Sequence, residues 1–463
     1  MIAVLLRLQS QGLLGDLPID SQDETWSEEL AKKPVKFFRP LVTAHSRLAI
    51  EYSLLCTRLI HELADEKKKN NNLHHLSARQ MKQIRAALMM AELLTIIYGS
   101  YLDVPREVER LLAEQKIYRY LLQNKALPFK DPAKIEPASY TQTVRGTTAL
   151  LNWPRLFSGR IRRVLVLATR SFENYKNFGR LISHLDQFAE PGLTYFSWIF
   201  YIPRLLVNVV LFLKHVAPHA WMGNSEKELD WLARLDAQLQ RRWFELGNDA
   251  VWLIAGLLNC FILTGTLAPV GMYLTISLFF FDVAMAVVRA CIEIGRLKKL
   301  KTDYLDLETK MRREGASDET LSEIASYLEH LNTRLIFEQK RLGLSVVSTF
   351  LLFLGMCTAI PALSLSPAIL FMGAAGILTI TLATYLLGKW VEKARPKDKL
   401  SGLLEEAKAP APVDQIVPPV KIAFSNSPSF FNKSIAIIKS QMHGSASDSD
   451  FTGQDLNKDS RSI

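Results

Sequence analysis

Two long runs of uncharged, mostly apolar residues dominate the hydropathy pattern in the second half of the chain. They cover 250–281 and 342–388, which are 32 and 47 residues respectively. A helix needs about 20 apolar residues to cross the hydrocarbon core of a bilayer, so each run has room for two crossings. Turn-forming residues mark the middle of each run, GTLAPVG at 265–271 and IPALSLSP at 360–367. We therefore expect two transmembrane helical hairpins, within 250–289 and 342–388.

Basic residues flank all four expected crossings, whereas the loops at the far ends of the hairpins are uncharged. Arg241 and Arg242 precede the first crossing, Arg289 follows the second, and Lys340 and Arg341 precede the third. Positive charge collects on the cytoplasmic side of membrane proteins, so we expect the bulk of the chain to be cytoplasmic. The pattern does not distinguish a bacterial inner membrane from a host membrane.

A seam of apolar residues predicts an antiparallel coiled-coil stalk between the hairpins, at 290–341. Apolar side chains recur at spacings of three and four on both sides of REGASDE, 313–319, where Gly315 favours a helix end and Ser317 a helix start. The seam either binds a partner or only orients the membrane helices. Its expected members are Leu297, Leu300, Tyr304, Leu307, Met311, Leu321, Ile324, Leu328, Leu331 and Leu335.

The first half of the chain also shows helical periodicity. Apolar positions over 41–66, 77–99 and 105–123 predict a helical N-terminal region, 1–135. Residues 136–249 predict basic amphipathic and membrane-associated helices. Their arginines favour contact with an anionic membrane face, and a solvated basic face on a packed helix is the alternative. These arginines are Arg155, Arg160, Arg162, Arg163 and Arg170.

Two charged residues lie inside apolar segments. The segment 192–214 is long enough to cross, but Arg204 follows Pro203 at its centre, where an arginine costs about 2.5–3.5 kcal/mol on insertion scales. We expect a re-entrant or interfacial hairpin bent at Pro203, with a full span as the alternative. Asp282 interrupts the apolar residues of the first hairpin. It either binds a proton or cation or makes a neutral contact between helices, and a spanning 192–213 would make Arg204 its candidate partner.

The composition and the motif content limit the classes of function that the protein can have. The 463 residues carry 56 Lys and Arg against 46 Asp and Glu, a net charge of +10. No nucleic-acid-binding motif accompanies this charge, so we expect an anionic membrane face as its partner and no nucleic acid. The four cysteines form no CxxC pair, and the chain contains no phosphate-binding glycine loop, nucleophile elbow or HExxH. We expect no enzyme, no cofactor and no metal.

The C-terminal region, 389–463, predicts a Pro-rich linker and a disordered tail. Together with the apolar runs 251–281 and 342–388, the polar tail 444–463 gives the chain an architecture that resembles membrane-inserted effector proteins secreted into host cells by intracellular bacteria. The resemblance implies action at a host membrane and a C-terminal secretion signal, often rich in glutamate. The nearest such pair, Glu405 and Glu406, lies well upstream of the end.

The sequence thus predicts an all-α, multi-spanning integral membrane protein. Its expected function is that of a membrane-anchored interaction or scaffold protein, with a protein partner bound through the stalk or the N-terminal helices. One alternative is a transporter or channel for protons or cations that uses Asp282. The other is a helical pore-forming protein that is soluble before insertion.

Overall fold

A computed structural model describes residues 2–15, 17, 26–70, 76–123, 140–171, 201–218, 222–360 and 366–396, with single residues and short pieces between 179 and 199. The described residues are helical and contain no strand, which confirms the all-α class. The chain divides into two units, 1–409 and 410–463. Most of the expected linker and tail, 397–463, lies outside the described residues.

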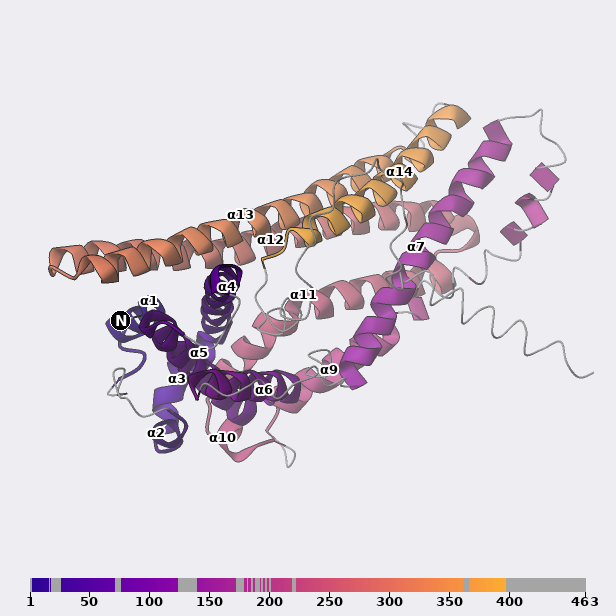
Figure 1. Ribbon diagram of the computed structural model, residues 1–463. Helices are drawn as coiled ribbons and strands as arrows, with labels where there is room; N and C mark the ends of the chain where they lie inside the picture. The colour runs from indigo at the N-terminus through magenta and orange to yellow at the C-terminus, as the bar shows by residue number, and fades with distance from the viewer. Residues whose placement is uncertain are drawn as a thin grey trace, which may run out of the picture. The chain divides into compact units, whose positions relative to one another are not determined.

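Several short helices and three longer ones make up the N-terminal region (Figure 1). Ser77 begins α5 with a capping box, in which its hydroxyl accepts from the Gln80 amide and the Gln80 side chain accepts from the Ser77 amide. Pro105 occupies the first turn of α6, where its missing N–H costs nothing. The elements are α1 (Ala3–Ser10), α2 (Ser27–Ala31), α3 (Val35–Thr43), α4 (His45–Asn70), α5 (Ala78–Ile96), the π-helix η1 (Ile97–Tyr101) and α6 (Pro105–Leu122).

The middle of the chain supplies helices that pack beside the apolar runs. Pro203 lies in the first turn of α9, where a proline is tolerated. Most of 192–200 lies outside the described residues, so the expected bend of this segment stays a prediction. The α11 helix continues without a break from a charged stretch into the first apolar run. The elements are α7 (Tyr140–Ser171), α9 (Ile202–Val216), α10 (Asn224–Lys227), α11 (Trp231–Leu257), the π-helix η3 (Leu258–Ile262) and the 3₁₀-helix η4 (Gly265–Leu267).

Two long antiparallel helices, α12 (Ala268–Arg313) and α13 (Asp318–Cys357), run side by side and join the apolar runs to the stalk (Figure 1). Their turn contains Gly315 at φ +71°, a left-handed conformation that favours glycine, and the Ser317 hydroxyl accepts from the Thr320 amide to begin α13. Neither helix breaks between its apolar part and residues 290–341. Bending where the stalk meets the apolar runs is therefore restricted.

The last helix, α14 (Pro367–Lys393), packs closely on α13. Glycines allow the approach: a Cβ at Gly355 would lie 2.6 Å from Ile377 Cγ1, and one at Gly373 would overlap the Thr358 hydroxyl. Small residues at such contacts are typical of helices that associate within a bilayer.

Five helical stretches are long and apolar enough to cross a membrane by length and composition. The most apolar window of Ala78–Tyr101 is 67% buried, against 11–22% for the windows in Trp231–Ile262, Gly265–Arg313, Asp318–Cys357 and Pro367–Lys393. The first stretch is therefore covered mainly by the protein core. The other four present their apolar side chains outward. Contiguous outward apolar surface of this kind is unusual for a protein in water.

A single apolar core joins the N-terminal helices to the stalk. Seven of the expected seam residues are buried, and Leu300 and Tyr304 are fully buried together with Leu48 and Leu55 of α4. Met311, Leu321 and Leu328 are half-buried. Because the seam is covered by helices of the same chain, most of it is not an open partner surface.

Buried ion pairs cross this core. Arg7 of α1 makes a bidentate pair with Glu51 of α4, and the Tyr304 hydroxyl of α12 donates to the same carboxylate at 2.8 Å. The Tyr327 hydroxyl of α13 donates to the Glu51 backbone carbonyl at 3.2 Å. Burial by itself would lower the pKa of Arg7, but Glu51, Tyr304 and Tyr327 together raise it above the ordinary value, so this guanidinium stays charged.

A second buried pair lies further along α4. Arg58 donates to both carboxylate oxygens of Glu323 on α13, with 2.6 Å between Nη2 and Oε2, and Arg79 of α5 approaches the same oxygen at 3.2 Å. Arg58 is 1% exposed and Glu323 is 8% exposed. Removal of one partner of such a pair leaves a buried charge without its counter-ion.

We expect Glu323→Ala to lower the free energy of unfolding of the N-terminal helices from the stalk by about 3 kcal/mol. The reason is that Arg58 then loses its bidentate carboxylate and keeps, among the described residues, the pair with Glu62. The matched control is Glu329→Ala on the exposed face of the same helix, which should change it by less than about 0.5 kcal/mol. Thermal unfolding in detergent micelles measures both. Equal effects of the two substitutions would contradict a structural role for the pair.

Candidate functional site

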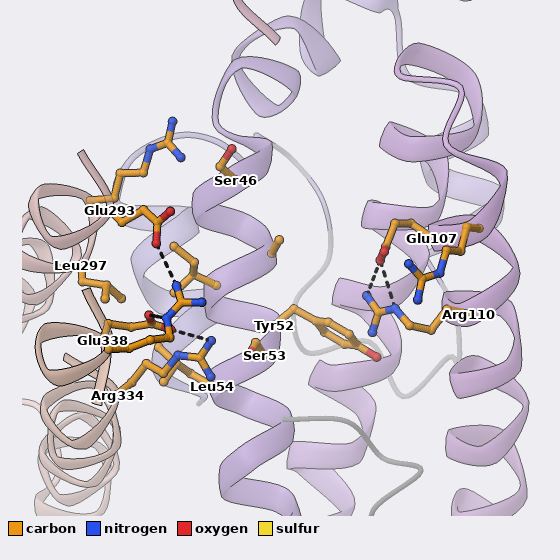
Figure 2. Close-up of a pocket in the computed structure, with 15 residues that line it drawn as sticks. Ser46, Tyr52, Ser53, Leu54, Glu107, Arg110, Glu293, Leu297, Arg334 and Glu338 are labelled. Carbon is orange, nitrogen blue, oxygen red and sulfur yellow. Dashed lines mark hydrogen bonds and ion pairs between the residues drawn. The ribbon is translucent and has the colours of Figure 1, made fainter. Parts of the chain in front are cut away.

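A cavity of about 450 Å³ lies where α4 and α6 meet the part of the stalk next to the apolar runs. In Figure 2, Ser46 and Ser53 of α4 lie between Glu338 of the stalk and Arg110 of α6. Residues four and seven apart on a helix share one face, and this spacing places Arg334, Glu338 and Arg341 of α13 together. The full lining is Ser46, Ala49, Ile50, Tyr52, Ser53, Leu54, Arg106, Glu107, Arg110, Glu293, Arg296, Leu297, Arg334, Glu338 and Arg341.

A chain of ion pairs orders the stalk side of the cavity. Arg341 Nη2 lies 3.0 Å from Glu293 Oε2 on α12, and its Nε lies 2.8 Å from Glu338 Oε2 on its own helix. Arg334 Nη2 lies 3.2 Å from the other oxygen of Glu338. These contacts tie α12 to α13 at the position where the stalk meets the apolar runs.

The α6 side of the cavity is ordered by a second set of pairs. Arg110 pairs with Glu107 at 2.8 Å and with Glu114 at 3.0 Å. Burial alone would lower the pKa of Arg110, but the two carboxylates and Tyr52 together raise it above the ordinary value, so Arg110 stays charged. In contrast, Arg296 of α12 is half-buried and has no carboxylate oxygen within 4 Å among the described residues.

His45 begins α4, next to Ser46 of the cavity lining, and is 3% exposed. Its Nδ1–H donates to the Val42 carbonyl at 2.8 Å, which leaves Nε2 as the site that would gain a proton. Burial lowers the pKa of His45 to about 4, the Val42 carbonyl and Asp236 oppose this, and Arg241 and Arg296 add to it. The ring is therefore neutral at pH 7, and the positive charge beside it is that of the arginines.

The two charged residues expected inside apolar segments have separate partners. Arg204 forms a bidentate pair with Asp249 of α11, with 2.6 Å between Nε and Oδ2, and Asp249 is fully buried. Asp282 accepts a hydrogen bond from Trp252 Nε1 at 3.0 Å. The expected alternative pairing of Arg204 with Asp282 is therefore not formed. Asp249 lies on a different helix from Arg204, and Trp252 on a different helix from Asp282, so helical spacing could not identify these partners.

Arginines of α7 contact the second apolar hairpin. Arg160 donates to the Thr381 hydroxyl of α14, and Arg163 Nη1 lies 3.4 Å from Met356 Sδ of α13. These two guanidiniums therefore lie against side chains of the second apolar run.

The other arginines of the basic segment have different environments. Arg155 donates to the Tyr201 hydroxyl at 3.1 Å, and its guanidinium lies over that ring. Arg162 pairs with Asp186. The Arg170 side chain lies outside the described residues. Contact of these residues with a membrane surface stays a prediction.

No family model matches the chain, and no curated protein or solved structure is significantly similar to it. Sequence reasoning did not identify the cavity. Its lining comes from four helices that are up to 295 residues apart, from Ser46 to Arg341, and only the spacing of Arg334, Glu338 and Arg341 on one face was available as a local signal.

We expect the stability of the protein to fall as the pH is lowered from about 6.5 toward 4, partly because of His45. Its folded pKa of about 4 lies below the ordinary value of 6.5, so in this window the unfolded state binds the proton and the folded state does not. The loss due to His45 is on the order of 1.4 kcal/mol per pH unit within the window.

His45→Asn is the matched variant, because its side-chain amide can still donate to the Val42 carbonyl. Apparent melting temperatures at pH 7.5 and pH 5 should therefore differ less for the variant than for the wild type. Equal differences would contradict a neutral, buried His45.

Proposed function

We propose that the protein is a membrane-anchored helical interaction protein. In this proposal α11 with α12, and α13 with α14, form two transmembrane hairpins, and the stalk and N-terminal helices form one cytoplasmic module. The described helices support it because α12 and α13 continue without a break from their apolar parts into the stalk. A module held by two continuous helices keeps a fixed position at the membrane face.

The observation that carries the proposal is the inverted polarity of the helices near the apolar runs. In α9, Asn208 and His215 are buried and hydrogen-bond to Glu245 and Glu226, whereas its apolar side chains point outward. Leu206, Val210 and Leu213 are more than half exposed. In water, each Å² of this exposed apolar surface would forgo roughly 25 cal/mol of hydrophobic stabilisation. At a membrane interface, lipid would cover the surface. It supports an interfacial position for α9.

The same polarity extends over the expected hairpins. Large apolar side chains on all four helices point outward, with Phe261, Phe280 and Met372 more than half exposed. The carboxylate among them, Asp282, accepts a hydrogen bond from Trp252 within the protein. A pore-forming protein that is soluble before insertion would have to cover this surface, so this arrangement favours permanent insertion.

The interaction role rests on the N-terminal module. Because the seam of the stalk is covered by α1 and α4, a protein partner would bind the outer faces of the N-terminal helices or of the stalk. The architectural resemblance to secreted effectors adds a host membrane as the place of action.

A second candidate function is proton- or cation-linked transport through Asp282. One observation favours it: the Trp252 side chain that donates to Asp282 also stacks on Tyr201, which receives a hydrogen bond from Arg155, so polar groups continue from the apolar hairpin toward α7. A lone hydrogen-bonded acid can equally be a neutral contact between helices.

Topology is tested by single cysteines in a background without native cysteines. We expect introduced cysteines at Ser225, Glu314 and Ser401 to be shielded together from an impermeant maleimide in intact cells, and those at Thr266 and Ser364 to be labelled. Carbonate should leave the protein in the membrane pellet. Release by carbonate, or labelling of Ser225 and Ser401 on opposite sides, would contradict the two-hairpin proposal.

Asp282→Asn separates the two functions. The asparagine carbonyl can still accept from Trp252 Nε1, so an interaction protein should keep its abundance and melting temperature. A transporter should lose proton- or cation-dependent flux in reconstituted vesicles, because the amide cannot take up a proton or carry a negative charge. Thr275→Ala on the same helix is the control substitution.

A further inference from the structure

We propose that the cavity between α4, α6 and the stalk binds a phosphate-bearing anion. The proposal goes beyond membrane anchoring, and only the lipid source of the phosphate rests on the proposed function. Five guanidinium groups and three carboxylates line the cavity, so the site carries a positive excess. Guanidinium groups match phosphate oxygens in geometry and hold them with two parallel hydrogen bonds.

Arg296 is the cation on which the proposed anion site depends. Glu293 and Glu338 are engaged by Arg341 and Arg334, and the described residues place no carboxylate oxygen within 4 Å of Arg296. It nevertheless lies half-buried and close enough to His45 to lower the pKa of that ring. A partly desolvated cation without a counter-ion is unfavourable, and an anion in the cavity would remove that cost.

The rest of the lining fits a small amphiphilic anion. The hydroxyls of Ser46, which donates to Gln240 Oε1 at 3.2 Å, and of Ser53 add polar surface to the wall. Ile50, Leu54 and Leu297 provide an apolar wall. A volume of about 450 Å³ is within the range of small-molecule sites and too small for a folded partner. A phosphate on a polyol or glycerol fits this combination of cations, hydroxyls and apolar surface.

The position of the cavity makes a lipid headgroup one possible source of the phosphate. The expected second crossing ends at residue 289, and Arg296 follows seven residues later, about 10 Å along the helix axis. Arg341 directly precedes the third crossing. If the hairpins are inserted, the cavity faces the headgroup layer. A soluble phosphate ester is the other source of the same chemistry.

The test uses the full-length protein in detergent micelles and two probes. Inositol 1,4,5-trisphosphate is the soluble probe, measured by titration calorimetry. Phosphatidylinositol 4-phosphate is the lipid probe, measured against phosphatidylcholine by native mass spectrometry. Arg296→Gln should weaken binding of the effective probe by about tenfold or more. Lys299→Gln, an exposed lysine outside the cavity on the same helix, removes the same charge and should change binding by less than about twofold.

The outcomes are distinguishable. Binding of the lipid probe alone supports a headgroup site, and binding of the soluble probe supports a site for a phosphate ester. Binding of neither probe, equal binding by wild type and Arg296→Gln, or equal losses in Arg296→Gln and Lys299→Gln would overturn the proposal. Melting temperatures of both variants verify folding. If the chain proves not to be inserted, the soluble probe still tests the cavity by itself.

Discussion

The buried carboxylate of Glu51 constrains the whole arrangement of helices. It lies in an apolar core, and its neutralisation requires Arg7 from α1 together with the Tyr304 hydroxyl from α12. Separation of the N-terminal helices from the stalk would expose apolar surface and break up this pair. The Arg58–Glu323 pair applies the same constraint further along α4. A shift of α4 along the stalk would leave a buried charge without its counter-ion, which is costly. The two pairs therefore favour the observed register of α4 over shifted ones.

That register builds the cavity. The same α4 helix that holds Glu51 in the core presents Ser46, Ile50 and Ser53 to the cavity, and α12 and α13 present Arg296 and Arg341 opposite them. The cavity thus exists only while the N-terminal helices are docked. If the proposed insertion holds, occupation of the cavity by an anion would stabilise the docked state by mass action, which couples the module to whatever supplies the phosphate.

The sequence predicted features that depend on local pattern. The apolar runs, the turn at Gly315 and the helix start at Ser317 all follow from composition or from backbone preferences of single residues. Sequence patterns did not identify which helices cover each apolar face. The seam was expected to pair two arms, but α1 and α4 complete its core, because an apolar stripe does not specify its partner. Asp249 and Trp252 were missed for the same reason, as was the cavity.

Cross-linking in native membranes tests the central claim most directly, namely that the N-terminal helices are docked on a stalk that the two hairpins anchor to the bilayer. Gln11 Nε2 of the α1 end lies 3.2 Å from Asp303 Oδ2 of α12, so cysteines at these two positions should be joined by a short bismaleimide. The account predicts efficient intramolecular cross-linking, with the product retained in the membrane pellet after carbonate treatment. Absence of the cross-link, or its recovery in the carbonate supernatant, would contradict the account.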